Sequence, residues 1–298
     1  MCRLMFTAIT SVVVLGSRGA AAQRVVGRDL LEFPLGILAE APALSDHMTA
    51  GLWNPASAML RPTTRASIGF AGLTTPQDVG VRLEMIAASY RLKPNVTGSL
   101  SVAEASVADI LRTDTDPQSL GSEVPYGTTV VSAGLATVYK SATLGLSTRY
   151  RWGNADAEHA GAFAVDAGAI VDRIVGTPVR VAVSTFLLSP SGTADASYFA
   201  AADLPVFKRD STVMIRAGFS ATKTESRGAE RYAFGTATYR QIDLSGGMSA
   251  VHEFGNSSKR WRLGLGVRHA GYTVAIGRED GGAGFGGSYQ FLLTRAIK

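Results

Sequence analysis

Residues 259–270, KRWRLGLGVRHA, alternate two kinds of side chain along their length. Large apolar residues stand at every second position, namely Trp261, Leu263, Leu265 and Val267. The positions between them hold Arg262, Gly264, Gly266 and Arg268. Strict alternation of this kind predicts a β-strand with one apolar face. A soluble sandwich would carry long solvated side chains on the second face, whereas small residues and scattered charges suit the crowded lumen of a membrane barrel.

The same alternation recurs along most of the chain. It predicts thirteen strands, near residues 65–73, 79–92, 96–109, 127–139, 142–152, 161–172, 178–188, 211–222, 230–241, 243–254, 260–269, 271–278 and 285–296. A further strand near 30–38 would make fourteen, and loss of one would leave twelve; bacterial barrels usually have an even number. Polar stretches at 110–125, 189–210 and 223–230 are expected to be surface loops. The expected fold is all-β, a transmembrane antiparallel β-barrel of 12–14 strands.

The first 22 residues have the anatomy of a secretory signal peptide. Arg3 precedes an apolar run from Leu4 to Leu15, and small residues Ala20 to Ala22 offer a cleavage site. The run is shorter than the roughly 18 apolar residues that a membrane helix needs. We therefore expect three regions: signal peptide 1–22, an N-terminal segment 23–60 as a candidate plug of the lumen, and the barrel 61–298. The expected location is the outer membrane of a Gram-negative cell.

Composition excludes several classes of protein. Apolar residues make up 46% of the 298-residue chain and charged residues only 18%, which excludes intrinsic disorder. The single cysteine, Cys2, lies in the predicted leader, so the mature chain has no thiol chemistry. Loss of Arg3 and Arg18 with the leader would lower the net charge from +5 to +3. That excess is too small to indicate nucleic-acid binding, which needs a clustered basic face.

Motifs for catalysis and metal binding are missing from the sequence. The four histidines, His47, His159, His252 and His269, form neither an HExxH motif nor a pair four residues apart. No G-x-S-x-G elbow is present. The glycine-rich run 281–287 lacks the Lys-Ser/Thr of a phosphate-binding loop. We predict a protein that is not an enzyme and that has no metal and no cofactor.

Charges at the polar positions of the strands are expected to face the lumen. An arginine on the lipid face would cost about 2–4 kcal/mol at the membrane midplane. The candidate lumen-lining residues are Glu84, Arg149, Arg151, Asp166, Arg180, Arg216, Arg262 and Arg268. They either line a path or bind a polar head group, or they form a structural ladder of ion pairs; the ladder is favoured.

Aromatic residues recur near the predicted strand ends, as the interfacial girdles of a barrel require. They are Tyr90, Tyr126, Tyr150, Trp152, Tyr198, Tyr232, Trp261 and Tyr272.

The stretch Leu44–Leu60 contains Trp53, Asn54, Pro55 and Ala56. This turn resembles the Trp-Asn-Pro-Ala stretch near the N-terminus of the PorV/PorQ family, within the FadL-like superfamily of outer-membrane barrels. Burial of Trp53 would anchor the segment, and Asn54 before Pro55 makes a rigid turn. Residues 109–116 leading to Tyr126, residues 179–187, and WRLGLGV at 261–267 before the final hairpin are similar to the same family.

The resemblance implies two functions between which the sequence does not decide. One is a FadL-like channel that passes hydrophobic or amphipathic small molecules through a lumen partly closed by residues 23–60. The alternative is a non-conducting barrel that acts as scaffold or shuttle for an exported protein partner in secretion or surface attachment. In both cases the expected surroundings are the lipid bilayer and lipopolysaccharide, with no nucleic acid.

Overall fold

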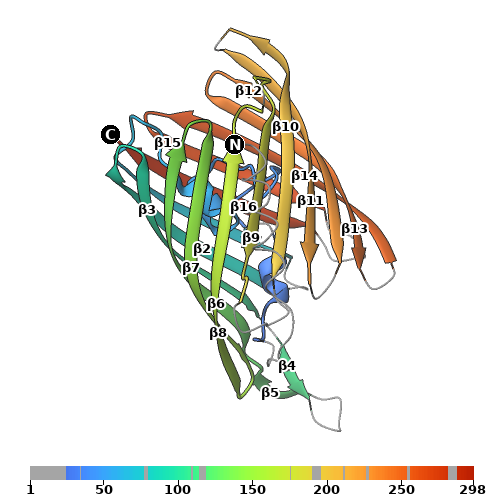
Figure 1. Cartoon of the computed structure of the whole chain (residues 1–298). Helices are drawn as coiled ribbons and strands as arrows, with labels where there is room; N and C mark the ends of the chain where they lie inside the picture. The colour runs from blue at the N-terminus through green and yellow to red at the C-terminus, as the bar shows by residue number, and fades with distance from the viewer. Residues whose placement is uncertain are drawn as a thin grey trace.

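The computed structural model describes residues 25–33, 35–76, 80–108, 110–113, 119–174, 176–189, 196–210, 212–225, 228–253, 256–280 and 287–298. The predicted signal peptide and Cys2 lie outside these residues. Fourteen antiparallel strands form one closed barrel, in which β1 pairs with both β2 and β16. Figure 1 shows the long strands side by side along the wall of the barrel. The prediction of an all-β antiparallel barrel is confirmed, at the upper limit of the expected strand number.

The barrel strands follow one another around the wall in chain order. They are β1 (Ala66–Thr74), β2 (Val81–Lys93), β3 (Val96–Val107), β6 (Tyr126–Tyr139), β7 (Ala142–Ala155), β8 (Glu158–Val171), β9 (Arg180–Phe186), β10 (Ser197–Arg209), β11 (Val213–Thr224), β12 (Ala229–Tyr239), β13 (Ile242–Glu253), β14 (Asn256–His269), β15 (Tyr272–Glu279) and β16 (Ser288–Ile297). A separate hairpin, β4 (Leu111–Thr113) and β5 (Ser119–Glu123), stands within the predicted loop 110–125.

The fourteenth strand is not the one that the sequence suggested. Residues 30–38 contain a short 3-10 helix, η1 (Asp29–Glu32), and turns, whereas the predicted loop 189–210 contains strand β10. In β10 alanine stands on both faces, since Ala200 and Ala202 alternate with the buried Ala201. The two faces of β10 therefore differ little in hydrophobicity, and the alternation that predicts the other strands is not visible in this one.

The two faces of the wall differ as the pattern of residues 259–270 requires. Leu263 is 64% exposed on the outer face of β14, whereas Arg262 is 4% exposed on the inner face. Large apolar side chains cover the outer face of the other strands too, among them Ile86, Leu100, Leu135 and Phe163. Such a surface is stable only against lipid. Among the described residues, no helix has the length and hydropathy needed to cross a membrane.

The barrel has two distinct ends. Tight turns at Lys140-Ser141, Arg240-Gln241 and Ala270-Gly271 lie at the end where β1 begins and β16 finishes, here called the turn end. Lys140, Arg240 and Ala270 have positive φ, as the first residue of a two-residue hairpin turn requires. The β4–β5 hairpin projects from the opposite end, here called the loop end (Figure 1).

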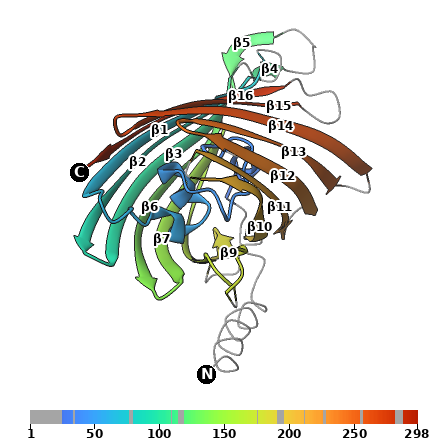
Figure 2. The same ribbon diagram turned by 90° about the horizontal axis from the view of Figure 1, so that it is seen from above.

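Residues 25–60, here called the inner segment, fold inside the ring of strands (Figure 2). Two further 3-10 helices, η2 (Met48–Leu52) and η3 (Pro55–Ala58), follow η1. Leu31, Leu35 and Ile37 are almost completely buried and pack in one apolar cluster with side chains of the wall. Full burial of each such side chain stabilises the fold by about 1.5–3 kcal/mol. The apolar core of the molecule is thus the contact between the inner segment and the wall.

Candidate functional site

The Trp-Asn-Pro-Ala turn is closed by hydrogen bonds within the inner segment. Trp53 Nε1 donates to the carbonyl of Leu35 at 2.8 Å, and Asn54 Nδ2 donates to the carbonyl of Ala43 at 2.7 Å. Asn54 Oδ1 accepts from the amide of Ala56 at 3.0 Å and so caps η3. The turn therefore has a fixed shape to present to the wall.

Two wall glycines make room for this turn. Gly145 on β7 and Gly168 on β8 stand directly opposite each other in the register. A Cβ at Gly145 would collide with the backbone of Pro55 and Ala56, and one at Gly168 would collide with Asn54 Oδ1. The small residues on the inner face thus do more than fill a crowded lumen, because here they allow the inner segment to touch the backbone of the wall.

A buried ion pair lies beside the same turn. Arg149 on β7 pairs through Nε with Asp166 on β8, and both side chains are inaccessible to solvent. Asp166 also accepts hydrogen bonds from the amides of Leu187 at 3.1 Å and Leu188 at 3.0 Å. The guanidinium of Arg149 lies 4.9 Å from the ring of Phe186. The two amide hydrogen bonds to Asp166 hold the segment after β9 in place. Removing either charge of the buried pair would leave the other uncompensated.

At the loop end, single side chains of the wall hold the start of the inner segment. Arg151 Nη1 donates to the carbonyls of Val25 at 3.0 Å and Val26 at 3.3 Å. Tyr126 donates its hydroxyl to Asp29 Oδ1 at 2.6 Å. These contacts place the beginning of the inner segment near the loop end, whereas its last residues lead into β1 at the turn end.

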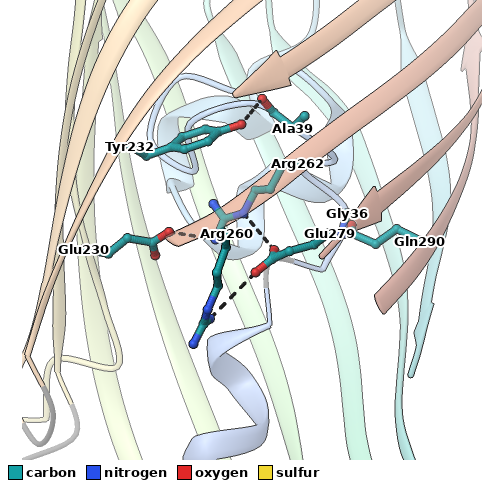
Figure 3. Close-up of polar contacts among 8 residues, drawn as sticks. All are labelled: Gly36, Ala39, Glu230, Tyr232, Arg260, Arg262, Glu279 and Gln290. Carbon is teal, nitrogen blue, oxygen red and sulfur yellow. Dashed lines mark hydrogen bonds and ion pairs between the residues drawn. The ribbon is translucent and has the colours of Figure 1, made fainter. Parts of the chain in front are cut away.

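A polar network from β12, β14, β15 and β16 lies beside the middle of the inner segment (Figure 3). Arg262 donates to Glu279 Oε2 at 2.7 Å and to Glu230 Oε1 at 2.8 Å. Tyr232 donates to the carbonyl of Ala39 at 2.7 Å, and Gln290 accepts from the amide of Gly36 at 3.3 Å. Arg260 approaches Glu279 at 3.7 Å. The charges of the wall thus neutralise one another, and neutral groups make these contacts to the inner segment.

A cavity of about 540 Å³ opens beside the inner segment at the turn end. Arg180 and Arg216 each bind Asp203 in bidentate fashion, with N···O distances from 2.6 to 3.0 Å. Arg268 pairs with Asp243 at 2.8 Å. Most of these side chains line the cavity, and bidentate arginine–carboxylate pairs hold them in fixed positions.

The inner segment contributes Glu40, Asp46 and His47 to this cavity. Their ligand atoms lie within 4.8 Å of one another, a spacing that a metal ion could bridge. Arg61 pairs with Asp46 at 3.2 Å, and Arg180 also acts on both carboxylates. Of the three, Asp46 is paired with an arginine, and the absence of a metal stays a prediction.

The two carboxyls of the cluster titrate differently. Burial raises the pKa of Glu40, and the charge of His47 offsets only part of that effect. Desolvation also raises the pKa of Asp46, but His47 and Arg61 outweigh it and leave that pKa lowered. Because 58% of the Asp46 side chain is exposed, solvent screens those charges, and Glu40 is the stronger determinant of pH dependence here.

Seven of the eight predicted lumen residues lie on the inner face of the wall: Arg149, Arg151, Asp166, Arg180, Arg216, Arg262 and Arg268. Glu84 does not. It is exposed on the outer face of β2, opposite Glu104 of β3. The inner positions of β2 are the apolar Val81, Leu83 and Met85, which pack against the inner segment. The assumption that charge points inward therefore failed where the lumen itself is apolar.

Two of the predicted girdle residues also belong to the interior. Tyr232 is 1% exposed and binds Ala39, and Tyr126 binds Asp29. Tyr90, Tyr150, Trp152, Trp261 and Tyr272 are exposed on the outer face. Tyr198 is half-buried and donates to Glu225 at 3.0 Å.

Sequence reasoning missed the carboxylates that pair with the arginines. Asp203, Glu230, Asp243 and Glu279 occupy inner positions of their strands and could have been found by the same alternation. The alternation along β7 and β8 could not show that Gly145 and Gly168 contact the inner segment.

A closed antiparallel barrel with an apolar outer face, exposed aromatic residues near its ends and charges inside defines a transmembrane β-barrel of the outer-membrane class. No protein-family model matches the chain, and no curated protein does. Among solved structures, the chain is similar to the Acinetobacter baumannii outer membrane protein Omp33, with 11% identity, 78% of this chain and 98% of that chain covered, and a TM-score of 0.47. It is also similar to a triple mutant of the Rh. blastica porin, with 11% identity, 78% of this chain and 99% of that chain covered, and a TM-score of 0.42. The resemblance to the PorV/PorQ family and the FadL-like superfamily stays a prediction.

Proposed function

We propose that this protein is exported through residues 1–22, inserts into the outer membrane and passes small solutes through a lumen that the N-terminal segment 23–60 opens and closes. The observation that supports this proposal is the closure of the wall. Strand β1 pairs with β16 without help from the inner segment, so the segment can leave the lumen while the sheet stays intact. Its described contacts with the wall are side-chain hydrogen bonds and packing, which can be broken and reformed.

The lining of the turn-end cavity bears on the class of solute. Arg180, Arg268 and Asp243 line it from the wall, and Glu40 and Asp46 line it from the inner segment. Such groups interact favourably with polar or charged solutes and are costly to leave beside an apolar one. We therefore propose small polar solutes in place of the hydrophobic or amphipathic ones that the family resemblance implies. In barrels of this kind the short turns face the periplasm, which gives the cavity a periplasmic opening.

Single-channel conductance in planar bilayers tests the proposal. The full chain is compared with a deletion of residues 25–60 and with the full-length double variant Tyr232→Phe, Gln290→Ala, which removes the wall contacts to Ala39 and Gly36. We expect rare openings for the wild type, large steady steps for the deletion and more frequent openings for the double variant. Tyr239→Phe, the same tyrosine change on an exposed side chain, should match the wild type.

Silence of all forms, with heat-modifiability on gels showing folded barrels, would contradict the transport proposal. It would favour the alternative function, a non-conducting scaffold or shuttle for an exported protein. The double variant guards against misfolding of the deletion, because it retains the whole inner segment.

A further inference from the structure

The outer face of the wall carries an apolar groove of about 820 Å³ near the turn end. It crosses β1, β2, β3, β6 and β7, and its volume lies within the range of small-molecule sites. Its large outward side chains are Ile68, Tyr90, Leu92, Leu100, Leu135 and Leu146. Lipid meets every part of the outer face, so a hollow of this size requires a local cause.

The groove arises because small and large residues alternate across neighbouring strands. Ala88 stands between Ile68 and Leu100 in the register, and Ala133 stands next to Leu100. In the adjacent row, Gly98 stands between Tyr90 and Leu135. These small residues form the floor of the groove, and the large residues form its walls.

A β-bulge completes the wall of the groove at the turn end. The β2–β3 register shifts between Arg91 and Lys93, which leaves Leu92 without a cross-strand partner. Leu92 is 56% exposed and leans over Gly98, so that its Cδ1 lies 3.2 Å from the point where a Gly98 Cβ would stand. A side chain at position 98 would meet Leu92 directly.

The turn-end limit of the groove carries a positive charge. Arg65, exposed just before β1, donates to the hydroxyl of Tyr90 through Nη2 at 3.2 Å and Nε at 3.4 Å. Its guanidinium also lies 5.8 Å from the Tyr90 ring. None of the ion pairs found among the described parts of the chain involves Arg65.

Three other tyrosines at this end have the same arrangement, which sets the level of the membrane surface. The cation-to-ring distances are 5.4 Å for Lys140 and Tyr139, 5.5 Å for Arg240 and Tyr239, and 5.2 Å for Arg295 and Tyr272. Tyrosine and basic side chains gather where lipid head groups begin. Arg65 and Tyr90 therefore lie at the level of the head groups, and the groove extends from them into the apolar layer.

We propose that this groove binds one anionic phospholipid, with its phosphate on Arg65 and an acyl chain over Ala88, Gly98 and Ala133. A cation at one end of an apolar groove matches a phosphate joined to a hydrocarbon chain, and the Tyr90 hydroxyl holds the guanidinium at the rim. This inference does not depend on whether the lumen conducts.

Native mass spectrometry of the full chain in detergent tests the acyl-chain part, with phosphatidylglycerol as the added lipid. The wild type should retain one lipid molecule. Ala133→Leu fills the floor of the groove and should weaken retention about tenfold. The matched control is Ala217→Leu, the same substitution at an outward position of β11 beside Leu204, and it should leave retention unchanged. Equal retention by both variants would overturn the proposal.

The same assay with phosphatidylcholine, a zwitterionic lipid with the same phosphate diester, tests the preference for a net anionic head group. Arg65→Gln should weaken binding of phosphatidylglycerol about fivefold and abolish the preference of the wild type for that lipid. Arg240→Gln removes an equivalent cation beside Tyr239, outside the groove, and should preserve the preference. Absence of a preference in the wild type would overturn the proposal. A dimer mass without lipid, lost in Ala133→Leu, would also overturn it by assigning the groove to a second copy of the chain.

Discussion

Two parts of the inner surface of the barrel, here called the apolar wall and the charged wall, meet the inner segment differently. Strands β7 and β8, with the buried Arg149–Asp166 pair, lie between them. Strands β1, β2, β3 and β6 present apolar side chains to the inner segment, among them Leu83, Met85 and Val130. Strands β9 to β15 present arginines and carboxylates, among them Arg262 and Glu279. The outer faces of both walls carry large apolar side chains, because both faces meet lipid. The side chains on the inner faces therefore determine how the inner segment is held.

The difference assigns separate tasks to the two walls. The apolar wall supplies stability because its Leu83, Met85 and Val130 are buried in one cluster with apolar side chains of the inner segment. The charged wall supplies little net stability, since desolvation offsets most of the gain from each ion pair. Its pairs instead fix the positions of Tyr232 and of the cavity-lining side chains. Removal of one member of a buried ion pair leaves the other charge unpaired, so it should lower the free energy of unfolding more than removal of one apolar side chain does.

The largest effect is expected from Arg262→Leu on the charged wall. The change leaves Glu279 and Glu230 without their common partner, at a cost of about 4 kcal/mol in the free energy of unfolding. Urea unfolding of the folded barrel in detergent measures it. Arg278→Leu breaks an exposed pair with Asp280 and should cost less than about 1 kcal/mol. Equal costs for the two variants would show that the interior network is not desolvated.

Leu83→Ala on the apolar wall should have the next largest effect. It removes a side chain that is 1% exposed and should cost about 3 kcal/mol in the same assay. Ile86→Ala, on the outer face of the same strand, should cost less because detergent or lipid fills the space. In a barrel lacking residues 25–60 the cost of Leu83→Ala should fall sharply. If it did not, Leu83 would be stabilising the wall itself and not its contact with the inner segment.

Gly168→Ala lies between the two walls and tests the contact of the Asn54–Pro55 turn. The new Cβ collides with Asn54 Oδ1, and strain of this kind costs about 2 kcal/mol. We expect the inner segment to leave its place more often and channel openings in planar bilayers to become more frequent. Gly266→Ala is the matched control, since its nearest neighbours lie at 3.5 Å or more. Unchanged openings in both variants would show that this turn does not hold the lumen closed.

The sequence could predict thirteen of the fourteen strands of the wall, because contact with lipid places large apolar residues at every second position. It could not predict β10, where Ala200, Ala201 and Ala202 remove the contrast between the two faces. It also misplaced Glu84, because the direction of a charge in β2 depends on the apolar inner segment behind that strand. The pairing of Arg180 and Arg216 with Asp203 required the register between strands, which single-strand patterns do not contain.

The smallest effect is a pH dependence that should depend on Glu40. The inner segment is called docked when it lies inside the barrel and free when it has left the lumen. A carboxyl whose pKa is higher in the docked segment than in the free one favours docking while it is protonated. This contribution is lost as pH rises through the pKa of the docked state. Burial raises the pKa of Glu40 above its ordinary value of 4.5, so channel openings should become more frequent as pH rises from about 4.5. The pKa of Asp46 is lowered in the docked segment, so the contribution of Asp46 to docking is lost only as pH falls below its ordinary pKa of 3.8. Glu40→Gln should therefore flatten the dependence above pH 4.5, whereas Asp46→Asn should leave it. Conductance recorded between pH 4 and 8 measures this effect, and an unchanged profile in Glu40→Gln would show that another group controls how the segment docks.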